Sequence, residues 1–214
     1  MATESCRLYL ITPPRIDVAD FAEDLARALD GGDVACVQLR LKEAADDDIR
    51  RAAEALLAVT RERGVELLMN DRPDLARETG CDGVHVGQQD ATYEAARQAV
   101  GAEGVVGVTC HGSRDLAVEA AAKGADYVAL GAFYPTDTKE AKARAEPDIL
   151  AWWSEMTTVP SVAIGGITPA NCPPLVRAGA DFLAVVAAVW NHPDGPAQAV
   201  KALEKAIAEA PESE

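Results

Sequence analysis

The chain has 214 residues, of which 49% are hydrophobic and 26% are charged, and its formal net charge at pH 7 is −15. This size and composition are typical of a globular protein with one domain, so we expect residues 1–214 to form one unit that ends in a short acidic tail, 209–214. The excess of acidic residues argues against nucleic acid and against an anionic membrane as partners, because both would repel such a surface.

Short β-prone runs alternate with Ala-rich amphipathic stretches along the chain. The β-prone runs are almost continuously apolar, as in strands whose two faces are both buried. Repeated alternation of strand and helix indicates a parallel sheet, and this number of repeats in about 200 residues predicts an α/β fold, a single (β/α)8 TIM barrel. The predicted strands are residues 8–12, 35–40, 67–71, 83–87, 105–110, 127–132, 161–165 and 182–189, and the predicted helices include 21–29, 47–63, 93–99, 114–123, 169–178 and 197–208.

A short Gly-X-Asp phrase precedes three of the predicted strands. Glycine at this place suits the end of a helix, where left-handed backbone is needed. The acids would lie at the amino-terminal end of the barrel, the end that serves stability, so we interpret them as structural. The phrases are Gly80-Cys81-Asp82, Gly124-Ala125-Asp126 and Gly179-Ala180-Asp181.

The chemistry of such a barrel is expected where its strands end, because the loops after the strands build the ligand site. The second predicted strand ends in Gln38, Arg40 and Lys42, an amide and two cations. Cations on a buried strand of an acidic protein need an anionic partner to offset their desolvation, which favours an anionic ligand. The alternative is an ion pair between Arg40 and an acid of the next strand.

Two carboxylates reach the same end of the barrel after the third and fourth predicted strands. Asp71 follows Asn70, and Asp90 follows the strand at 83–87. Mg²⁺ usually takes one or two protein carboxylates beside phosphate and water oxygens, so this pair is a candidate magnesium site. Alternatively, Asp71 caps a helix that begins at Pro73, and Asp90 caps the helix at 93–99.

The fifth and sixth predicted strands end in polar residues as well. Thr109 and His111 end the fifth, and His111 suits either a general acid or base or a hydrogen-bonding spacer. The sixth leads into Pro135-Thr136-Asp137-Thr138-Lys139. Its two threonine hydroxyls and its ammonium can bind phosphate oxygens, so we expect a loop that holds an anion, with an ordinary surface loop as the alternative.

The seventh predicted strand runs into Gly165-Gly166, just before a predicted helix. Bare amides near the start of a helix attract anions, and the loops after strands seven and eight commonly form the phosphate site of such barrels. We therefore expect a phosphate to bind here, close to the end of the strand at 182–189.

Cysteine usage and hydropathy bear on where the protein works. The five cysteines are an odd number at scattered spacings, without the close pair of a redox or zinc motif. No apolar run approaches the length of a membrane span, and the first residues lack the pattern of a secretory signal. We expect a cytoplasmic protein whose partners are small phosphorylated molecules. Whether it forms a homo-oligomer is left open by the sequence.

Several of these phrases together resemble the thiamine phosphate synthase and thiazole tautomerase superfamily over residues 8–189. They occur in the family's order at comparable intervals. The phrases are Gln38-Leu39-Arg40-Leu41-Lys42, Asn70-Asp71-Arg72, Gly83-Val84-His85-Val86-Gly87-Gln88-Gln89-Asp90, Pro135-Thr136-Asp137-Thr138-Lys139 and Ala163-Ile164-Gly165-Gly166-Ile167.

The resemblance implies a reaction and a role for each candidate residue. Such an enzyme joins an aminopyrimidine methyl diphosphate to a thiazole phosphate and releases pyrophosphate. The diphosphate would be held by Gln38, Arg40, Lys42 and Lys139, Mg²⁺ by Asp71 and Asp90, the pyrimidine by Asn70 and Thr109, and the thiazole phosphate by Thr136, Thr138 and the backbone of Gly166, Val186 and Ala187. The candidate catalytic residues are Arg40, Lys42, Thr109 and Lys139.

Other readings of the same residues stay open. A thiazole tautomerase shares the barrel and the histidine of the fifth strand, but typically lacks the carboxylate at the position of Asp90. A regulator of the same family would bind the diphosphate and Mg²⁺ without turnover. A phosphosugar isomerase or epimerase would need an acid or base pair inside the barrel, which the sequence does not indicate.

Overall fold

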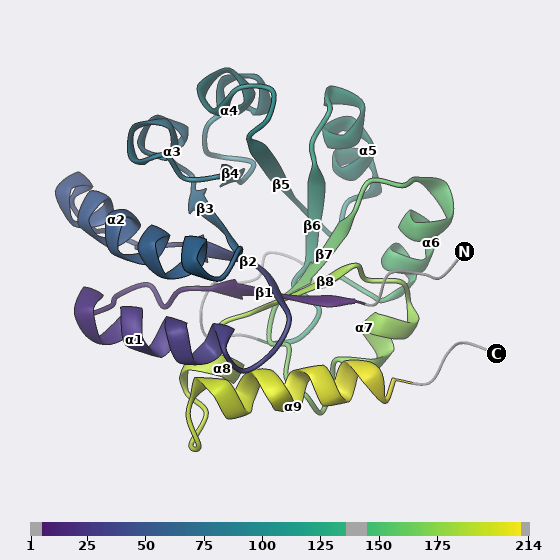
Figure 1. Cartoon of the computed structure of the whole chain (residues 1–214). Coiled ribbons are helices and arrows are strands. Elements are labelled where there is room, and N and C mark those ends of the chain that lie inside the picture. The colour runs from purple at the N-terminus through teal and green to yellow at the C-terminus, as the bar shows by residue number, and fades with distance from the viewer. Residues whose placement is uncertain (1–5, 136–144, 211–214) are drawn as a thin grey trace.

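Eight parallel strands follow one another around a closed barrel in chain order, β1 to β8, and helices surround them on the outside (Figure 1). The structure is a computed structural model that describes residues 6–135 and 145–210. It confirms the predicted (β/α)8 barrel. Each strand pairs with its neighbour in parallel, and β1 closes the ring by pairing with β8.

The element boundaries lie close to those expected, except that the helix predicted at 169–178 begins only at Pro173. The strands are β1 Arg7–Ile11, β2 Val34–Leu39, β3 Glu66–Asn70, β4 Gly83–Val86, β5 Val105–His111, β6 Tyr127–Gly131, β7 Ser161–Ile164 and β8 Phe182–Val185. The helices are α1 Val18–Leu29, α2 Asp46–Glu62, α3 Pro73–Thr79, α4 Tyr93–Val100, α5 Arg114–Lys123, α6 Asp148–Met156, α7 Pro173–Arg177, α8 Ala187–Trp190 and α9 Pro196–Ala208.

The prediction of one strand over residues 182–189 is wrong in its second half. The strand ends at Val185, and the backbone of Val186 turns there (φ −126°, ψ −85°) to begin the short helix α8. The Trp190 indole then donates to the Ile11 carbonyl at 2.7 Å, which ties α8 to β1. A short apolar run fits a strand and a buried helix equally well, so periodicity could not separate the two.

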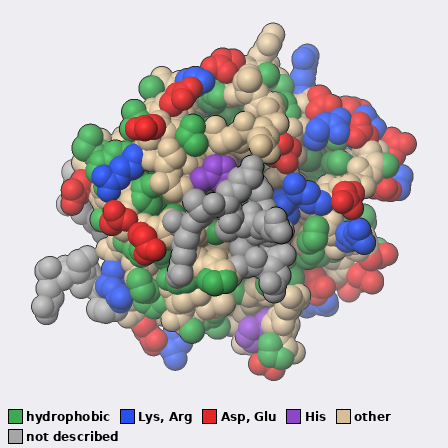
Figure 2. Space-filling model, turned by 180° about the vertical axis from the view of Figure 1, so that it is seen from behind, with side chains coloured by type: hydrophobic (Ala, Val, Ile, Leu, Met, Phe, Trp, Pro, Cys, Tyr) green, Lys and Arg blue, Asp and Glu red, His purple; other side chains and the backbone are tan. Residues whose placement is uncertain are grey.

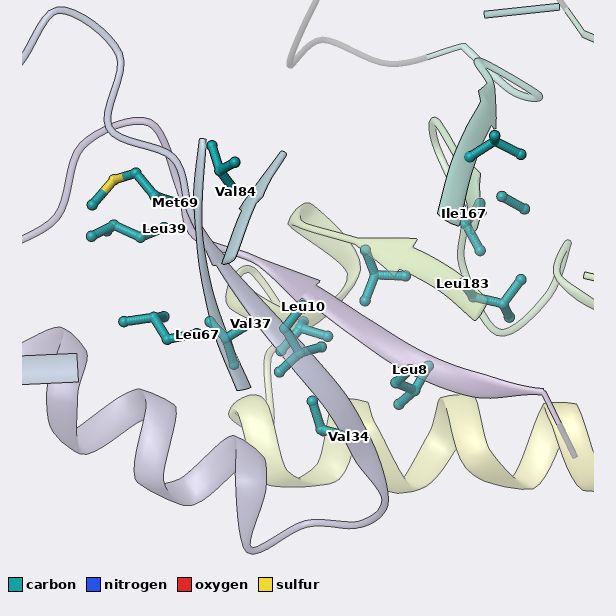
Figure 3. Close-up of a cluster of buried hydrophobic side chains, with 14 of the residues drawn as sticks. Leu8, Leu10, Val34, Val37, Leu39, Leu67, Met69, Val84, Ile167 and Leu183 are labelled. Atoms are coloured by element: carbon teal, nitrogen blue, oxygen red, sulfur yellow. The ribbon is translucent and has the colours of Figure 1, made fainter. Parts of the chain in front are cut away.

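Two apolar layers hold the barrel together. The larger layer lies between the strands and the helices, and includes the strand residues Leu10, Val37 and Met69 (Figure 3). The smaller layer fills the inside of the barrel and includes Tyr9 and Leu68. Strand residues therefore alternate between two buried faces, which explains why the strands read as continuous apolar runs.

The acids of the Gly-X-Asp phrases serve the structural role expected of them. Each carboxylate accepts a hydrogen bond from the backbone of a neighbouring strand at the amino-terminal end of the barrel. The bonds run from the amide of Leu67 to Asp82 (2.7 Å), from Val106 to Asp126 (2.6 Å) and from Ser161 to Asp181 (2.7 Å). The preceding glycines have positive φ, as expected at helix ends.

Replacing Asp82 by Ala is expected to destabilise the protein without altering catalysis. The Leu67 amide would lose the carboxylate that it donates to. An unsatisfied buried amide costs about 1 to 3 kcal/mol, which urea denaturation would measure as a lower free energy of unfolding. The KM values of the variant, measured well below its unfolding temperature, are expected to match those of the wild type; a selective loss of substrate affinity would contradict the structural role.

Charge is spread over the outer surface. Acidic and basic side chains intersperse over the face shown in Figure 2. Among the residues that the structure describes, no helix has the length and apolarity needed to cross a membrane.

Candidate active site

Backbone strain marks the carboxyl-terminal end of the barrel. Three described residues other than glycine have positive φ: Glu43 (61°), Asp71 (62°) and His111 (52°). They lie at or just beyond the ends of β2, β3 and β5. Such conformations cost on the order of 1 kcal/mol or more each and are retained mostly at functional sites. Their gathering at one end supports the expectation that ligands bind there.

The two cations after β2 have no carboxylate partner among the described residues. Arg40 is half-buried; its backbone amide donates to the Thr12 hydroxyl at 2.9 Å, whereas its guanidinium makes no hydrogen bond to another described residue. Burial lowers the pKa of its guanidinium, and the charge of Asp71 acts in the opposite direction from beyond ion-pair distance. The alternative of an ion pair with the next strand is therefore wrong within residues 6–135 and 145–210. A half-buried cation left without a partner favours an anionic ligand.

The two candidate metal ligands lie side by side. Burial, followed by the hydrogen bond and negative charge of Asp90, raises the pKa of Asp71 from 3.8 to about 6. Asn70 donates to the Asp71 carboxylate at 2.6 Å, and the Gly87 amide donates to Asp90 at 3.1 Å. The pair places negative charge where a cation would relieve the repulsion.

The capping alternatives for these acids are wrong. The N-cap residue of α3 is Arg72, whose side chain makes no capping bond, and the N-cap of α4 is Thr92, whose hydroxyl accepts from the Ala95 amide at 3.2 Å. Both carboxylates are thus available for another role.

A chain of hydrogen bonds crosses the inside of the barrel below these charges. The Gln38 amide nitrogen lies 2.8 Å from the Tyr9 hydroxyl, which lies 2.9 Å from that of Tyr127. Tyr127 in turn lies 2.8 Å from Nδ1 of His85, whose Nε2 lies 2.7 Å from the Thr109 hydroxyl. Two predicted substrate-binding residues, Gln38 and Thr109, therefore stand at the two ends of one buried polar chain.

The three middle members of this chain were not predicted as site residues. Tyr9, His85 and Tyr127 are buried inside the barrel, and the rings of His85 and Tyr127 stack with centroids 5.6 Å apart. Gly107 on β5 makes room for the Tyr127 ring, since a Cβ there would collide with it. The available signal was an aromatic or imidazole group with a polar tip inside an apolar strand, which needs a partner once buried.

The loops after β6 and β7 are joined by their backbones. The amide of Tyr134 donates to the Gly165 carbonyl at 3.0 Å. Gly166 has a φ of 62°, and a Cβ there would collide with the Pro135 carbonyl, so only glycine allows this approach. The Asn171 side chain donates to the Gly166 carbonyl at 2.9 Å and accepts from the Thr168 amide at 2.8 Å. The Gly165-Gly166 turn is thus held in one conformation.

Comparison with known proteins identifies the family to which the chain belongs. The family described as thiamine monophosphate synthase matches residues 8–189, which is most of the chain. The chain is a member of the thiamine monophosphate synthase family. This result confirms the resemblance seen in the ordered sequence phrases.

Individual members of the thiamine monophosphate synthase family are similar over nearly the full length. A thiamine-phosphate synthase from Rhodospirillum centenum is 64% identical over 195 residues, which are 91% of this chain and 94% of that protein. One from Hyphomonas neptunium is 50% identical and covers 92% and 91%. The solved thiamine phosphate pyrophosphorylase from Pyrococcus furiosus superposes with a TM-score of 0.83 at 31% identity, covering 95% of this chain and 96% of its own.

Some of the remaining candidate residues of this family member lie outside the described residues, and the structure places the others at the ends of β5 and β8. Thr136, Thr138 and Lys139 lie outside the described residues. Val186 directly follows β8, and Ala187 is the first residue of α8. His111 ends β5, past the irregular pairing with β6 between Thr109 and His111.

Within the described part of the chain, no group of three or more His, Cys, Asp or Glu side chains could hold a metal ion, so a cation here would depend on phosphate and water oxygens besides Asp71 and Asp90.

Proposed function

We propose that this chain is a transferase, a thiamine-phosphate synthase, that couples 4-amino-2-methyl-5-(diphosphomethyl)pyrimidine to thiazole phosphate and releases pyrophosphate. The names of its relatives support the activity. The observation that carries the proposal is the meeting of Arg40 and Lys42, cations with which no described carboxylate forms an ion pair, with the adjacent carboxylates Asp71 and Asp90 at one end of the barrel. A diphosphate that carries a divalent cation satisfies both sets of charges at once.

The cations stabilise the departure of the diphosphate. Negative charge grows on the leaving oxygens as the carbon–oxygen bond breaks, and Arg40 and Lys42 meet that charge. At an effective dielectric constant of about 20, a cation about 4 Å from a phosphate oxygen contributes on the order of 4 kcal/mol before desolvation. Because Arg40 is already half-buried and pairs with no carboxylate of the described residues, its positive charge is available to the diphosphate when the substrate arrives. Lys139 is proposed to add a further cation from its loop.

Asp71 and Asp90 suit Mg²⁺. Two neighbouring carboxylates, one with a raised pKa, make a hard oxygen donor set with excess negative charge. A Mg²⁺ ion held by these carboxylates would neutralise charge that develops as the diphosphate leaves. Asn70 holds the Asp71 carboxylate, and the Gly87 amide holds that of Asp90, which would orient both ligands.

The substrates themselves are positioned by the barrel. We place the pyrimidine at Asn70 and Thr109, above the buried chain of hydrogen bonds that fixes Thr109 and Gln38. The thiazole phosphate is proposed to bind the Gly166 amide and the backbone at Val186 and Ala187, together with Thr136 and Thr138. In the family, departure of the diphosphate gives a pyrimidine-methyl cation that the thiazole nitrogen captures, so no nucleophile from the protein is needed.

A direct assay tests the proposal. Purified protein is incubated with Mg²⁺ and both substrates, and pyrophosphate and thiamine phosphate are measured together. Equal amounts of the two products are expected. Isomerisation of the thiazole without pyrophosphate would identify a tautomerase, and diphosphate binding without turnover would identify a regulator; either outcome overturns the synthase proposal.

A further inference from the structure

The turn that carries Asp71 is an unusual one. The Arg72 amide donates to the Asn70 carbonyl at 2.8 Å, which closes a three-residue turn around Asp71 with its positive φ of 62°. Turns of this kind are rare and strained for a residue with a side chain. They persist only where the surrounding structure holds them, so some contact of the neighbouring residues must supply the restraint.

Arg72 supplies contacts of the required strength and direction. Its guanidinium donates to both oxygens of Asp46 (2.6 and 2.9 Å) and to both oxygens of Asp74 (2.9 and 2.6 Å). Each carboxylate thus accepts two hydrogen bonds from Arg72. Two such bidentate contacts fix the plane of a guanidinium in a way that a lysine ammonium cannot reproduce.

The two partners belong to the segments that carry the proposed diphosphate site. Asp46 is the first residue of α2, directly after the loop that bears Arg40 and Lys42, and Asp74 lies in the first turn of α3. Arg72 therefore joins the cationic loop after β2 to the turn that bears Asp71. These two segments must keep a fixed spacing if one diphosphate and its cation are to contact both.

We propose that Arg72 is a positioning residue, which holds the Asp71 carboxylate and the cation-bearing loop after β2 in register for a divalent cation and its diphosphate. The inference rests on the proposed function of this site. Arg72 acts through its neighbours and touches no reacting atom.

A second arginine provides a matched control. Arg50 also links α2 to α3, through two bonds to Glu78 at 2.9 and 3.0 Å and one to Asp47 at 2.8 Å. Its side chain is 36% exposed, against 37% for Arg72. Arg50 contacts neither the turn at Asp71 nor the loop after β2. It thus reports the cost of losing an ion-pair link between the same two helices.

The experiment compares Arg72→Gln with Arg50→Gln. Binding of inorganic pyrophosphate in the presence of Mg²⁺ is measured by calorimetry on the full chain, well below the unfolding temperature of each variant. We expect Arg72→Gln to bind about tenfold more weakly than the wild type, the loss typical when a residue that orients a metal ligand is removed, and Arg50→Gln to bind within about twofold of the wild type. In turnover, KM for the diphosphate substrate and the Mg²⁺ requirement are expected to rise in Arg72→Gln alone.

Arg72→Lys separates position from charge, and it decides the question if Arg72→Gln fails to fold. Lysine keeps the positive charge and loses the two paired contacts, so we expect it to bind severalfold more weakly than the wild type. Wild-type affinity in Arg72→Lys, unchanged affinity in Arg72→Gln, or equal losses in Arg72→Gln and Arg50→Gln would each overturn the proposal. If the wild type itself bound no pyrophosphate with Mg²⁺, the proposed function would fail rather than the role of Arg72.

Discussion

Replacing Arg40 by Gln is expected to lower kcat/KM for pyrophosphate release by roughly 10²- to 10³-fold, the usual effect of removing one charge-stabilising donor from a transition state. The same change is expected to leave the free energy of unfolding unchanged or to increase it. Burial of Arg40 lowers the pKa of its guanidinium, and the opposing charge of Asp71 does not fully offset this effect, so an uncharged amide is easier to bury. This pair of results would show that Arg40 favours catalysis at the expense of stability.

Steady-state kinetics and urea denaturation of the same protein check both halves of this expectation. Arg77→Gln is the matched control, because it removes the same charge from an exposed position on α3. Near-wild-type kinetics are expected for the control. Retention of full activity by Arg40→Gln would show that the guanidinium does not meet the leaving group.

Replacing Asp90 by Asn is expected to abolish most of the Mg²⁺-dependent activity, with a loss of roughly 10²-fold or more in kcat/KM, since one of the two proposed protein ligands to the ion is lost. Mg²⁺ with inorganic pyrophosphate is expected to raise the melting temperature of the wild type and to have little effect on the variant. The control is Glu94→Gln, an acid of α4 that pairs with Lys123 at 3.4 Å. Equal Mg²⁺ responses in wild type and Asp90→Asn would rule out Asp90 as a ligand.

Without metal, the carboxylate pair of Asp71 and Asp90 is expected to make the free energy of unfolding depend on pH. The unfolded chain ionises Asp71 near its ordinary pKa of 3.8, whereas the folded protein keeps the proton until about 6. The folded state binds more protons between these values, so stability falls as pH rises through them. We expect metal-free wild type to lose about 1 kcal/mol relative to Asp71→Asn between pH 4 and 6, because solvent screens part of the repulsion at this partly exposed group. Parallel denaturation curves at both pH values would contradict this assignment.

Most of the fold could be predicted from the sequence because local patterns and long-range packing agree along it. Strands buried on both faces give continuous apolar runs, and left-handed glycines mark the helix ends. The exception was the segment after Val185, where a helix of only four residues follows the strand. Its residues are apolar although only Val189 among 186–190 is fully buried, and such a run fits either conformation.

The residues proposed to bind the diphosphate and the metal were easier to predict from the sequence than the residues that hold them in place. Arg40, Asp71 and Asp90 stand out because charged groups follow apolar strands. Tyr9, His85 and Tyr127 carry no such signal, because their value lies in contacts between β1, β4 and β6 that only the closed barrel creates. Arg72 belongs to the phrase Asn70-Asp71-Arg72, but its partners lie on two different helices, which the sequence does not reveal.

One arrangement of hydrogens satisfies every bond of the chain inside the barrel. The Gln38 amide donates to Tyr9, the Tyr9 hydrogen can then point to Tyr127, and that of Tyr127 to Nδ1 of His85. In this arrangement His85 carries its hydrogen on Nε2 and donates it to Thr109. The Thr109 hydroxyl then has its own hydrogen left to donate toward whatever binds above it. Such a donor suits a ring nitrogen with a free lone pair, such as the pyrimidine of the proposed substrate presents.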